Sequence, residues 1–178
     1  MLRFINIFPI FISMLQIYTG NGKGKTTAAF GLAFRAKGRN KKVGIIQFAK
    51  PEESGEYLMA KNVGIEIYHY GFPGFIIKNP REEDFIEAEK AWKKFIEMSH
   101  QDFDIIILDE LNIALYYNLL DLNEIIEVLK NLKDKMEIII TGRYAKKELV
   151  EISDLVTEMC QVKHYFEKGV GAREGIEF

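Results

Sequence analysis

The sequence predicts an α/β protein whose mostly parallel sheet is flanked by helices, and three observations lead to that fold class. Continuous apolar runs, which suit strands buried on both faces, alternate with segments of helical periodicity. A glycine-rich loop, residues 19–27, joins the first apolar run to a helix-forming stretch. Two carboxylates, Asp109 and Glu110, end the apolar run 103–108. This combination is typical of a P-loop NTPase-like domain of the RecA-like type.

The composition limits the class of protein. The chain has 178 residues, which suits one domain with a proper core. Its formal net charge of −2 argues against a protein that neutralises many nucleic-acid phosphates. The single cysteine, Cys160, cannot form an internal disulfide, which favours a reducing cytoplasm. Three scattered histidines give no readable zinc site.

The first thirteen residues differ from the rest of the chain. They are apolar, but Asn6, Pro9 and Ser13 interrupt them, and they are too short to span a bilayer. No small-residue cleavage site follows them. We interpret 1–13 as an N-terminal extension that is a cover strand, a dimer arm or a translated upstream leader. We expect 14–178 to form a single nucleotide-binding domain without a membrane partner.

The glycine-rich loop carries the strongest chemical signal. Its glycines let backbone N–H groups turn inward around an anion, and the helix that follows adds its unpaired N–H groups and dipole. Lys25 supplies a mobile charge, and the Thr26 hydroxyl is placed to bind a Mg²⁺ held by the phosphates. The usual spacing has a glycine where Thr19 stands. The expected phosphate ligands are Gly20, Asn21, Gly22, Lys23, Gly24, Lys25, Thr26 and Thr27.

Two further sites are expected at the carboxyl ends of buried strands. In P-loop proteins an acidic residue there reaches the Mg²⁺ directly or through water, so Asp109 and Glu110 are candidate metal ligands beside Thr26. Arg143 directly follows the buried run 137–141 and its glycine, where an arginine can neutralise phosphate charge. The alternatives are an exposed acidic turn and an ordinary surface arginine.

The middle of the chain supplies two more strands and a long helix. The runs 43–48 and 65–70 are expected to be strands. Asn79 as cap, Pro80 at the first position and Glu82 three residues after the cap predict a helix start. One face of that helix is expected to carry Phe85, Ala88, Trp92, Phe95 and Ser99, with Trp92 in the core.

The last third of the chain continues the alternation. A short helical stretch, 112–120, leads to Asp121, which is expected to cap an amphipathic helix. A short helix is expected at 145–153 and a strand at 155–166, with Cys160 as a core residue.

Several motifs together resemble the P-loop ATP:corrinoid adenosyltransferases. They are Tyr18 to Gly31, Leu108-Asp-Glu-Leu111, Ile139-Ile-Thr-Gly-Arg143, Val162-Lys-His164 and the closing Gly175-Ile-Glu-Phe178. The resemblance runs from about Leu15 to the C-terminus. It implies transfer of the 5′-deoxyadenosyl group of ATP to the Co(I) of a reduced corrinoid, with triphosphate as the leaving group. Lys25, Arg143 and a Mg²⁺ would then stabilise the departing triphosphate.

The resemblance also implies features beyond the phosphate site. The family presses an aromatic loop on the lower corrin face, and Phe72 holds the matching position. The second aromatic of that loop corresponds to Gly74, so Phe75 is the candidate replacement. A homodimer and an electron donor, either a protein or reduced flavin, are implied as well.

Two other function classes stay open. One is a P-loop NTPase or phosphotransferase that attacks the γ-phosphate, and the other is a non-catalytic, nucleotide-gated binding module. Triphosphate rather than ADP as product separates the adenosyltransferase from both.

Overall fold

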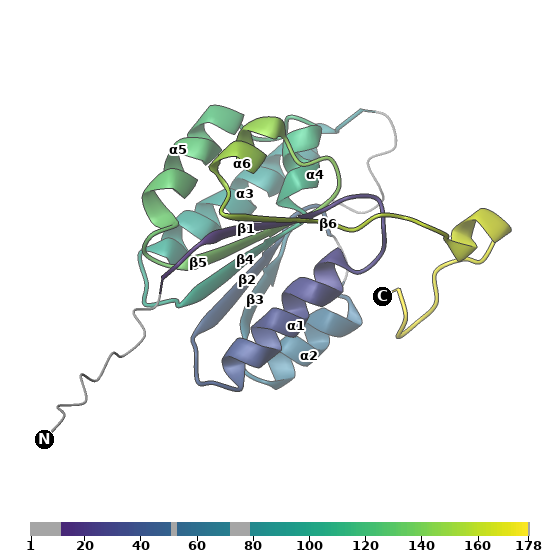
Figure 1. Ribbon diagram of the computed structural model, residues 1–178. Coiled ribbons are helices and arrows are strands. Elements are labelled where there is room, and N and C mark those ends of the chain that lie inside the picture. The colour runs from purple at the N-terminus through teal and green to yellow at the C-terminus, as the bar shows by residue number, and fades with distance from the viewer. Residues whose placement is uncertain (1–11, 51–52, 72–78, 178) are drawn as a thin grey trace, which may run out of the picture.

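The computed structural model describes residues 12–50, 53–71 and 79–177. Its centre is a six-stranded sheet with the strand order β3-β2-β4-β5-β1-β6 (Figure 1). All neighbouring strands pair in parallel, which confirms the predicted fold class. The strands are β1 Leu15–Thr19, β2 Val43–Gln47, β3 Glu66–His69, β4 Ile105–Asp109, β5 Glu137–Thr141 and β6 Leu155–Glu158.

Helices cover both faces of the sheet (Figure 1). On one face lie α1 Lys25–Lys37 and α2 Gly55–Asn62. On the other face lie α3 Glu82–Ser99, α4 Leu111–Tyr116, α5 Leu122–Leu132 and α6 Lys147–Ile152. A 3₁₀ turn, Tyr165–Lys168, lies in the segment after β6. No helix within the described ranges is long and apolar enough to cross a membrane.

The central strands are buried on both faces because helices pack against each of them. Every residue of β2, β4 and β5 is buried, as their continuous apolar sequences predict. One apolar cluster lies against α3 to α6 and includes the predicted core residue Trp92. A second cluster, which includes Phe30, lies under α1 and α2. The sheet is therefore a rigid base for whatever its loops carry.

The predicted start of the long helix was wrong. The helix begins at Glu82 and is capped by Arg81, not by Asn79. The Arg81 backbone N–H donates to Asp84 Oδ2 at 2.8 Å, and its guanidinium donates to both oxygens of the same carboxylate. The acid of this capping box is thus Asp84 instead of Glu82. Phe85, expected on the inward face, is exposed.

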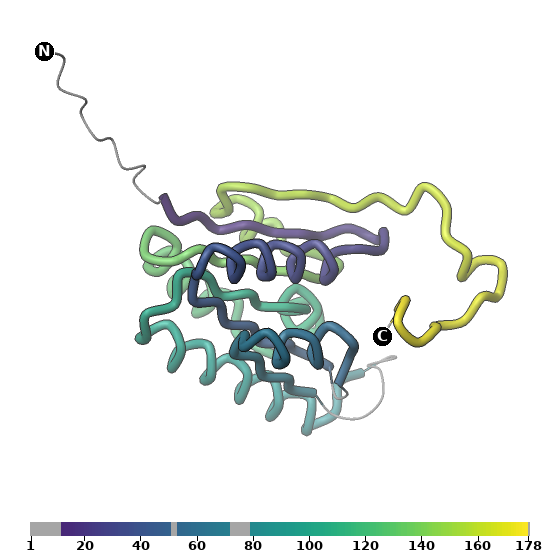
Figure 2. The backbone as a smooth tube through the Cα atoms, turned by 90° about the horizontal axis from the view of Figure 1, so that it is seen from below, coloured from purple at the N-terminus to yellow at the C-terminus, as the bar shows by residue number. Residues whose placement is uncertain are grey.

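The predicted strand 155–166 is also much shorter than expected. It ends at Glu158 because β1, its neighbour in the sheet among the described residues, ends at Thr19 and turns into the glycine-rich loop. Cys160 lies beyond that end and is exposed, so its expected core position was wrong. From there the chain leaves the body of the domain and returns toward the glycine-rich loop (Figure 2).

Candidate active site

The glycine-rich loop connects β1 to α1 at the carboxyl edge of the sheet. Gly20 and Gly24 have left-handed backbones, with φ of 93° and 113°, which side chains other than glycine rarely adopt. Gly22 is required for another reason, because a Cβ there would lie 2.7 Å from the Met159 carbonyl oxygen. The Gly22 N–H donates to that oxygen at 2.6 Å. The segment after β6 therefore forms one wall of the loop.

Lys25 is the first residue of α1, and its side chain is buried in the loop. Its ammonium donates to the Gly22 carbonyl oxygen at 2.7 Å. Burial lowers the pKa of Lys25, although the nearby charge of Glu110 works in the opposite direction. Within the part of the chain that the structure describes, the Gly22 carbonyl oxygen is the hydrogen-bond partner of this ammonium. A desolvated ammonium held by a neutral carbonyl group gains much from an anion, so Lys25 is well placed to hold a phosphate.

Asp109 is fully buried and accepts four hydrogen bonds. Oδ1 accepts from the hydroxyls of Thr141 at 2.6 Å and Thr26 at 2.9 Å. Oδ2 accepts from the amide of Gln47 at 3.0 Å and the ammonium of Lys50 at 2.6 Å. Burial raises the pKa of Asp109, but the charge and hydrogen bond of Lys50, with those of Thr141 and Gln47, outweigh burial and lower it. Asp109 is thus an ionised anchor for Thr26.

Glu110 lies beside Asp109 but in a different environment. Its backbone is left-handed, with φ of 62°, and its N–H donates to Thr141 Oγ1 at 3.0 Å. A Cβ at Gly142 would lie 3.0 Å from Glu110 Oε2, so the glycine leaves room for this carboxylate. Among the described residues, no hydrogen bond engages its carboxylate. Burial, followed by the charge of Asp109, raises the pKa of Glu110.

Arg143 is exposed and lies between two left-handed residues, Gly142 and Tyr144. The next residue, Ala145, donates its N–H to Thr19 Oγ1 at 3.4 Å, so this turn lies beside the start of the glycine-rich loop. Arg143 is also close enough to contribute to lowering the pKa of Lys25. The turn therefore brings the predicted arginine to the same edge of the sheet as Lys25 and Glu110.

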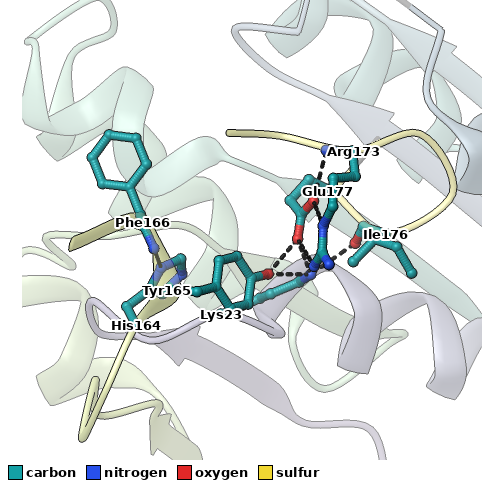
Figure 3. Close-up of polar contacts among 7 residues, drawn as sticks. All are labelled: Lys23, His164, Tyr165, Phe166, Arg173, Ile176 and Glu177. Carbon is teal, nitrogen blue, oxygen red and sulfur yellow. Dashed lines mark hydrogen bonds and ion pairs between the residues drawn. The ribbon is translucent and has the colours of Figure 1, made fainter. Parts of the chain in front are cut away.

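The site contains polar residues that sequence reasoning missed. Lys50, Gln47 and Thr141 all contact Asp109, and each ends or follows a buried strand. Their common signal is a polar side chain at the carboxyl end of an apolar run. Of the predicted residues, Lys23 points to the C-terminal segment, where its ammonium donates to Glu177 (Figure 3). Phe72 and Phe75 lie outside the described residues.

Comparison with known proteins identifies the family. A profile described as ATP:corrinoid adenosyltransferase BtuR/CobO/CobP matches residues 12–178. The chain belongs to the ATP:corrinoid adenosyltransferase family. Membership makes it an enzyme whose substrates are ATP and a corrinoid, and it favours the adenosyltransferase over the two other function classes.

Curated relatives agree with this assignment, and a solved structure agrees with the fold. The corrinoid adenosyltransferase of Pseudomonas aeruginosa is 38% identical over 169 residues, which cover 93% of this chain and 83% of the relative. That of Sinorhizobium is 40% identical over 172 residues, covering 93% and 80%. That of Escherichia coli K12 is 38% identical and covers 93% and 85%. The RadB recombinase aligns with 86% of this chain and 78% of its own at a TM-score of 0.51 and 14% identity, which shows the fold alone.

Proposed function

We propose that this enzyme transfers the 5′-deoxyadenosyl group of ATP to the Co(I) centre of a reduced corrinoid, in the synthesis or salvage of adenosylcobalamin. The electron pair of Co(I) attacks C5′ of the ribose, the C5′–O bond breaks, and its electrons leave with triphosphate. The observation that carries this proposal is the family match over a chain whose glycine-rich loop and Lys25 have the arrangement that a triphosphate needs. No side chain need act as nucleophile.

The protein's contribution is to stabilise the charge of the leaving group. All three phosphates depart together, so charge grows on the oxygen that leaves C5′. The N-terminus of α1 and the backbone N–H groups of 20–27, apart from that of Gly22, which donates to the Met159 carbonyl oxygen, supply fixed positive dipoles. Lys25 exchanges its bond to the Gly22 carbonyl for a phosphate oxygen. Arg143, on the neighbouring turn, adds a second cation.

A Mg²⁺ fits beside Thr26 and Glu110. Magnesium in nucleotide sites is held by one or two carboxylates, a hydroxyl and substrate phosphates. Asp109 holds the Thr26 hydroxyl at 2.9 Å, and Glu110 offers a carboxylate to a cation. The metal would neutralise phosphate charge close to these two acids. Within the described ranges, no group of three or more His, Cys, Asp or Glu offers an all-protein metal site, which favours a cation shared with the phosphates.

The corrin-facing half of the site involves other residues. We expect Phe72, and Phe75 in place of the second aromatic, to press on the lower corrin face and ease reduction from Co(II). The electron would come from a donor protein or reduced flavin in the cytoplasm. A homodimer is supported by the edge strand β6, where Leu155 and Val156 are exposed and a second copy would cover them.

The test is incubation of the chain with ATP, Mg²⁺ and a chemically reduced corrinoid. We expect the light-sensitive spectrum of an adenosylcorrinoid and one triphosphate per corrinoid converted. ADP and phosphate as products would contradict the proposal and identify attack at the γ-phosphate instead.

A further inference from the structure

Both ends of the C-terminal segment, residues 159–177, contact neighbouring residues of the glycine-rich loop. At one end the Met159 carbonyl oxygen accepts from the Gly22 N–H at 2.6 Å. At the other end the Glu177 carboxylate accepts from the Lys23 ammonium at 2.8 Å. Between these two contacts the segment runs outside the body of the domain (Figure 2). The loop is thus held by the segment at two consecutive residues.

The Lys23 ammonium is fully occupied by this segment. It donates to Tyr165 Oη at 3.0 Å, to the Ile176 carbonyl oxygen at 2.8 Å and to Glu177 Oε1 at 2.8 Å (Figure 3). An ammonium has three N–H donors, so these acceptors use all of them. The hydrogen bonds of Glu177 and Tyr165 accordingly raise the pKa of Lys23. While these contacts stand, Lys23 has no donor for a phosphate, unlike Lys25.

Glu177 is the centre of the cluster. It accepts from the backbone N–H of Arg173 at 2.7 Å, from the Arg173 guanidinium at 3.3 Å, and from the Tyr165 hydroxyl. These bonds, those of Arg173 first and then those of Lys23 and Tyr165, hold the pKa of Glu177 well below its usual range. One carboxylate therefore ties the folded tip of the segment to the loop.

Lys23 is also the attachment point of the segment beyond Cys160. Among the described residues, the hydrogen bonds and ion pairs of the segment 161–177 are formed either within the segment or with Lys23. Val162 is 96% exposed and Phe166 is 72% exposed, so apolar packing does little to fix the segment. Loss of the Glu177 carboxylate would therefore weaken the attachment of the segment to the loop, because it removes the ion pair with Lys23 and the bonds that hold Arg173 and Tyr165 in the cluster.

We propose that Glu177 is a positioning residue for ATP: through Lys23 it clamps the glycine-rich loop in the conformation that receives the triphosphate. The inference rests on the proposed function only in taking the loop as the triphosphate site. A flexible loop loses conformational entropy when it closes on a ligand, and a loop that is already ordered loses less. The clamp therefore increases the affinity for ATP without contacting the ligand. Glu177 therefore affects the binding of ATP and takes no part in the transfer of the adenosyl group to cobalt.

The experiment compares Glu177→Ala with the matched control Glu174→Ala, which removes a neighbouring exposed carboxylate outside the cluster. Binding of Mg²⁺–ATP is measured by calorimetry without corrinoid, and turnover is measured over a range of ATP concentrations. We expect Glu177→Ala to raise the Kd and KM for ATP about five-fold, the range of a well-formed exposed ion pair, while kcat changes less than about two-fold. Trypsin should cleave after Lys163 and Lys168 faster than in the unaltered chain. The control should match the unaltered chain in every measurement.

A second variant tests the route through Lys23. Lys23→Met should raise the Kd for ATP by a similar factor, and the double variant should be no worse than either single one. An unchanged Kd in Glu177→Ala, or additive losses in the double variant, would overturn the proposal. Failure of the unaltered chain to transfer an adenosyl group would overturn the proposed function instead, and the ATP titrations would still decide the role of Glu177.

Discussion

Removal of Lys50 is the perturbation whose effect follows most directly from the structure. Lys50 forms an ion pair at 2.6 Å with Asp109, whose side chain is 0% exposed, while that of Lys50 is 25% exposed. Breaking a buried pair by deleting one partner costs about 3–5 kcal/mol because the remaining charge is buried without compensation. Asp109 keeps three neutral donors, so we expect the Lys50→Met variant to lose about 3 kcal/mol, at the low end of that range.

The assay is thermal and urea-induced unfolding of Lys50→Met beside the control Lys93→Met, whose ion pair with Glu89 is exposed. For a chain of this size about 3 kcal/mol corresponds to a fall in Tm of about 6–12 °C. The control should lose no more than about 0.5 kcal/mol. In a double-mutant cycle with Asp109→Asn, Lys50→Met should cost much less. A Tm within about 2 °C of the unaltered protein would refute the claim that Lys50 compensates a buried charge.

Four further outcomes are expected. Lys25→Ala should lower turnover by orders of magnitude even with Co(I) supplied, since a transition-state contact is lost; near-normal turnover at saturating ATP would exclude that role. A chain that begins at Met14 should fold and turn over, because Met14, directly before β1, donates its N–H to the Glu137 carboxylate at the start of β5; insoluble expression would contradict this. Phe72→Ala should lose most of its activity in an assay that starts from Co(II) with a mild reductant but keep much of it when Co(I) is supplied, and Phe75→Ala should show a weaker form of the same difference. Equal losses in both assays would indicate that Phe72 is an ordinary packing residue. The stability difference between the Lys50→Met variant and the unaltered chain should persist from about pH 4 to about pH 10, because the pKa of Asp109 is lowered and that of Lys50 is raised. The difference should shrink as the pH falls through the pKa of folded Asp109 or rises through that of folded Lys50, and urea titrations at several pH values would measure it.

The sequence predicted the parts of the fold that local patterns determine. The apolar runs of β2, β4 and β5 admit only strands buried on both faces, and the structure has them there. The glycine-rich loop requires a strand before it and a helix after it, and the structure has β1 before it and α1, which begins at Lys25, after it. The cap at Asp121 was also confirmed, since its carboxylate accepts from the N–H groups of Asn123 and Glu124.

Features that depend on contacts distant in sequence were not predictable in this way. Lys50 and Asp109 are 59 residues apart and meet only because β2 and β4 are neighbours in the sheet. The length of β6 depends on where β1 ends, which the apolar pattern of 155–166 does not contain. The cap at Arg81 arises because Asp84 accepts from both the backbone and the guanidinium of that residue, an arrangement that competed with the Asn-Pro signal and prevailed.

The two carboxylates of the site show how one strand end produces two different groups. Asp109 still belongs to β4 and points among neutral donors from β2, α1 and β5, and the ammonium of Lys50 compensates its charge. At Glu110 the backbone turns to a left-handed conformation and starts α4, which places the next carboxylate outside that set of donors. A second negative charge in this position, beside an arriving triphosphate, is unfavourable unless a cation lies between them. Burial, followed by the charge of Asp109, raises the pKa of Glu110, and a cation that arrived with the triphosphate would relieve the repulsion between these negative groups.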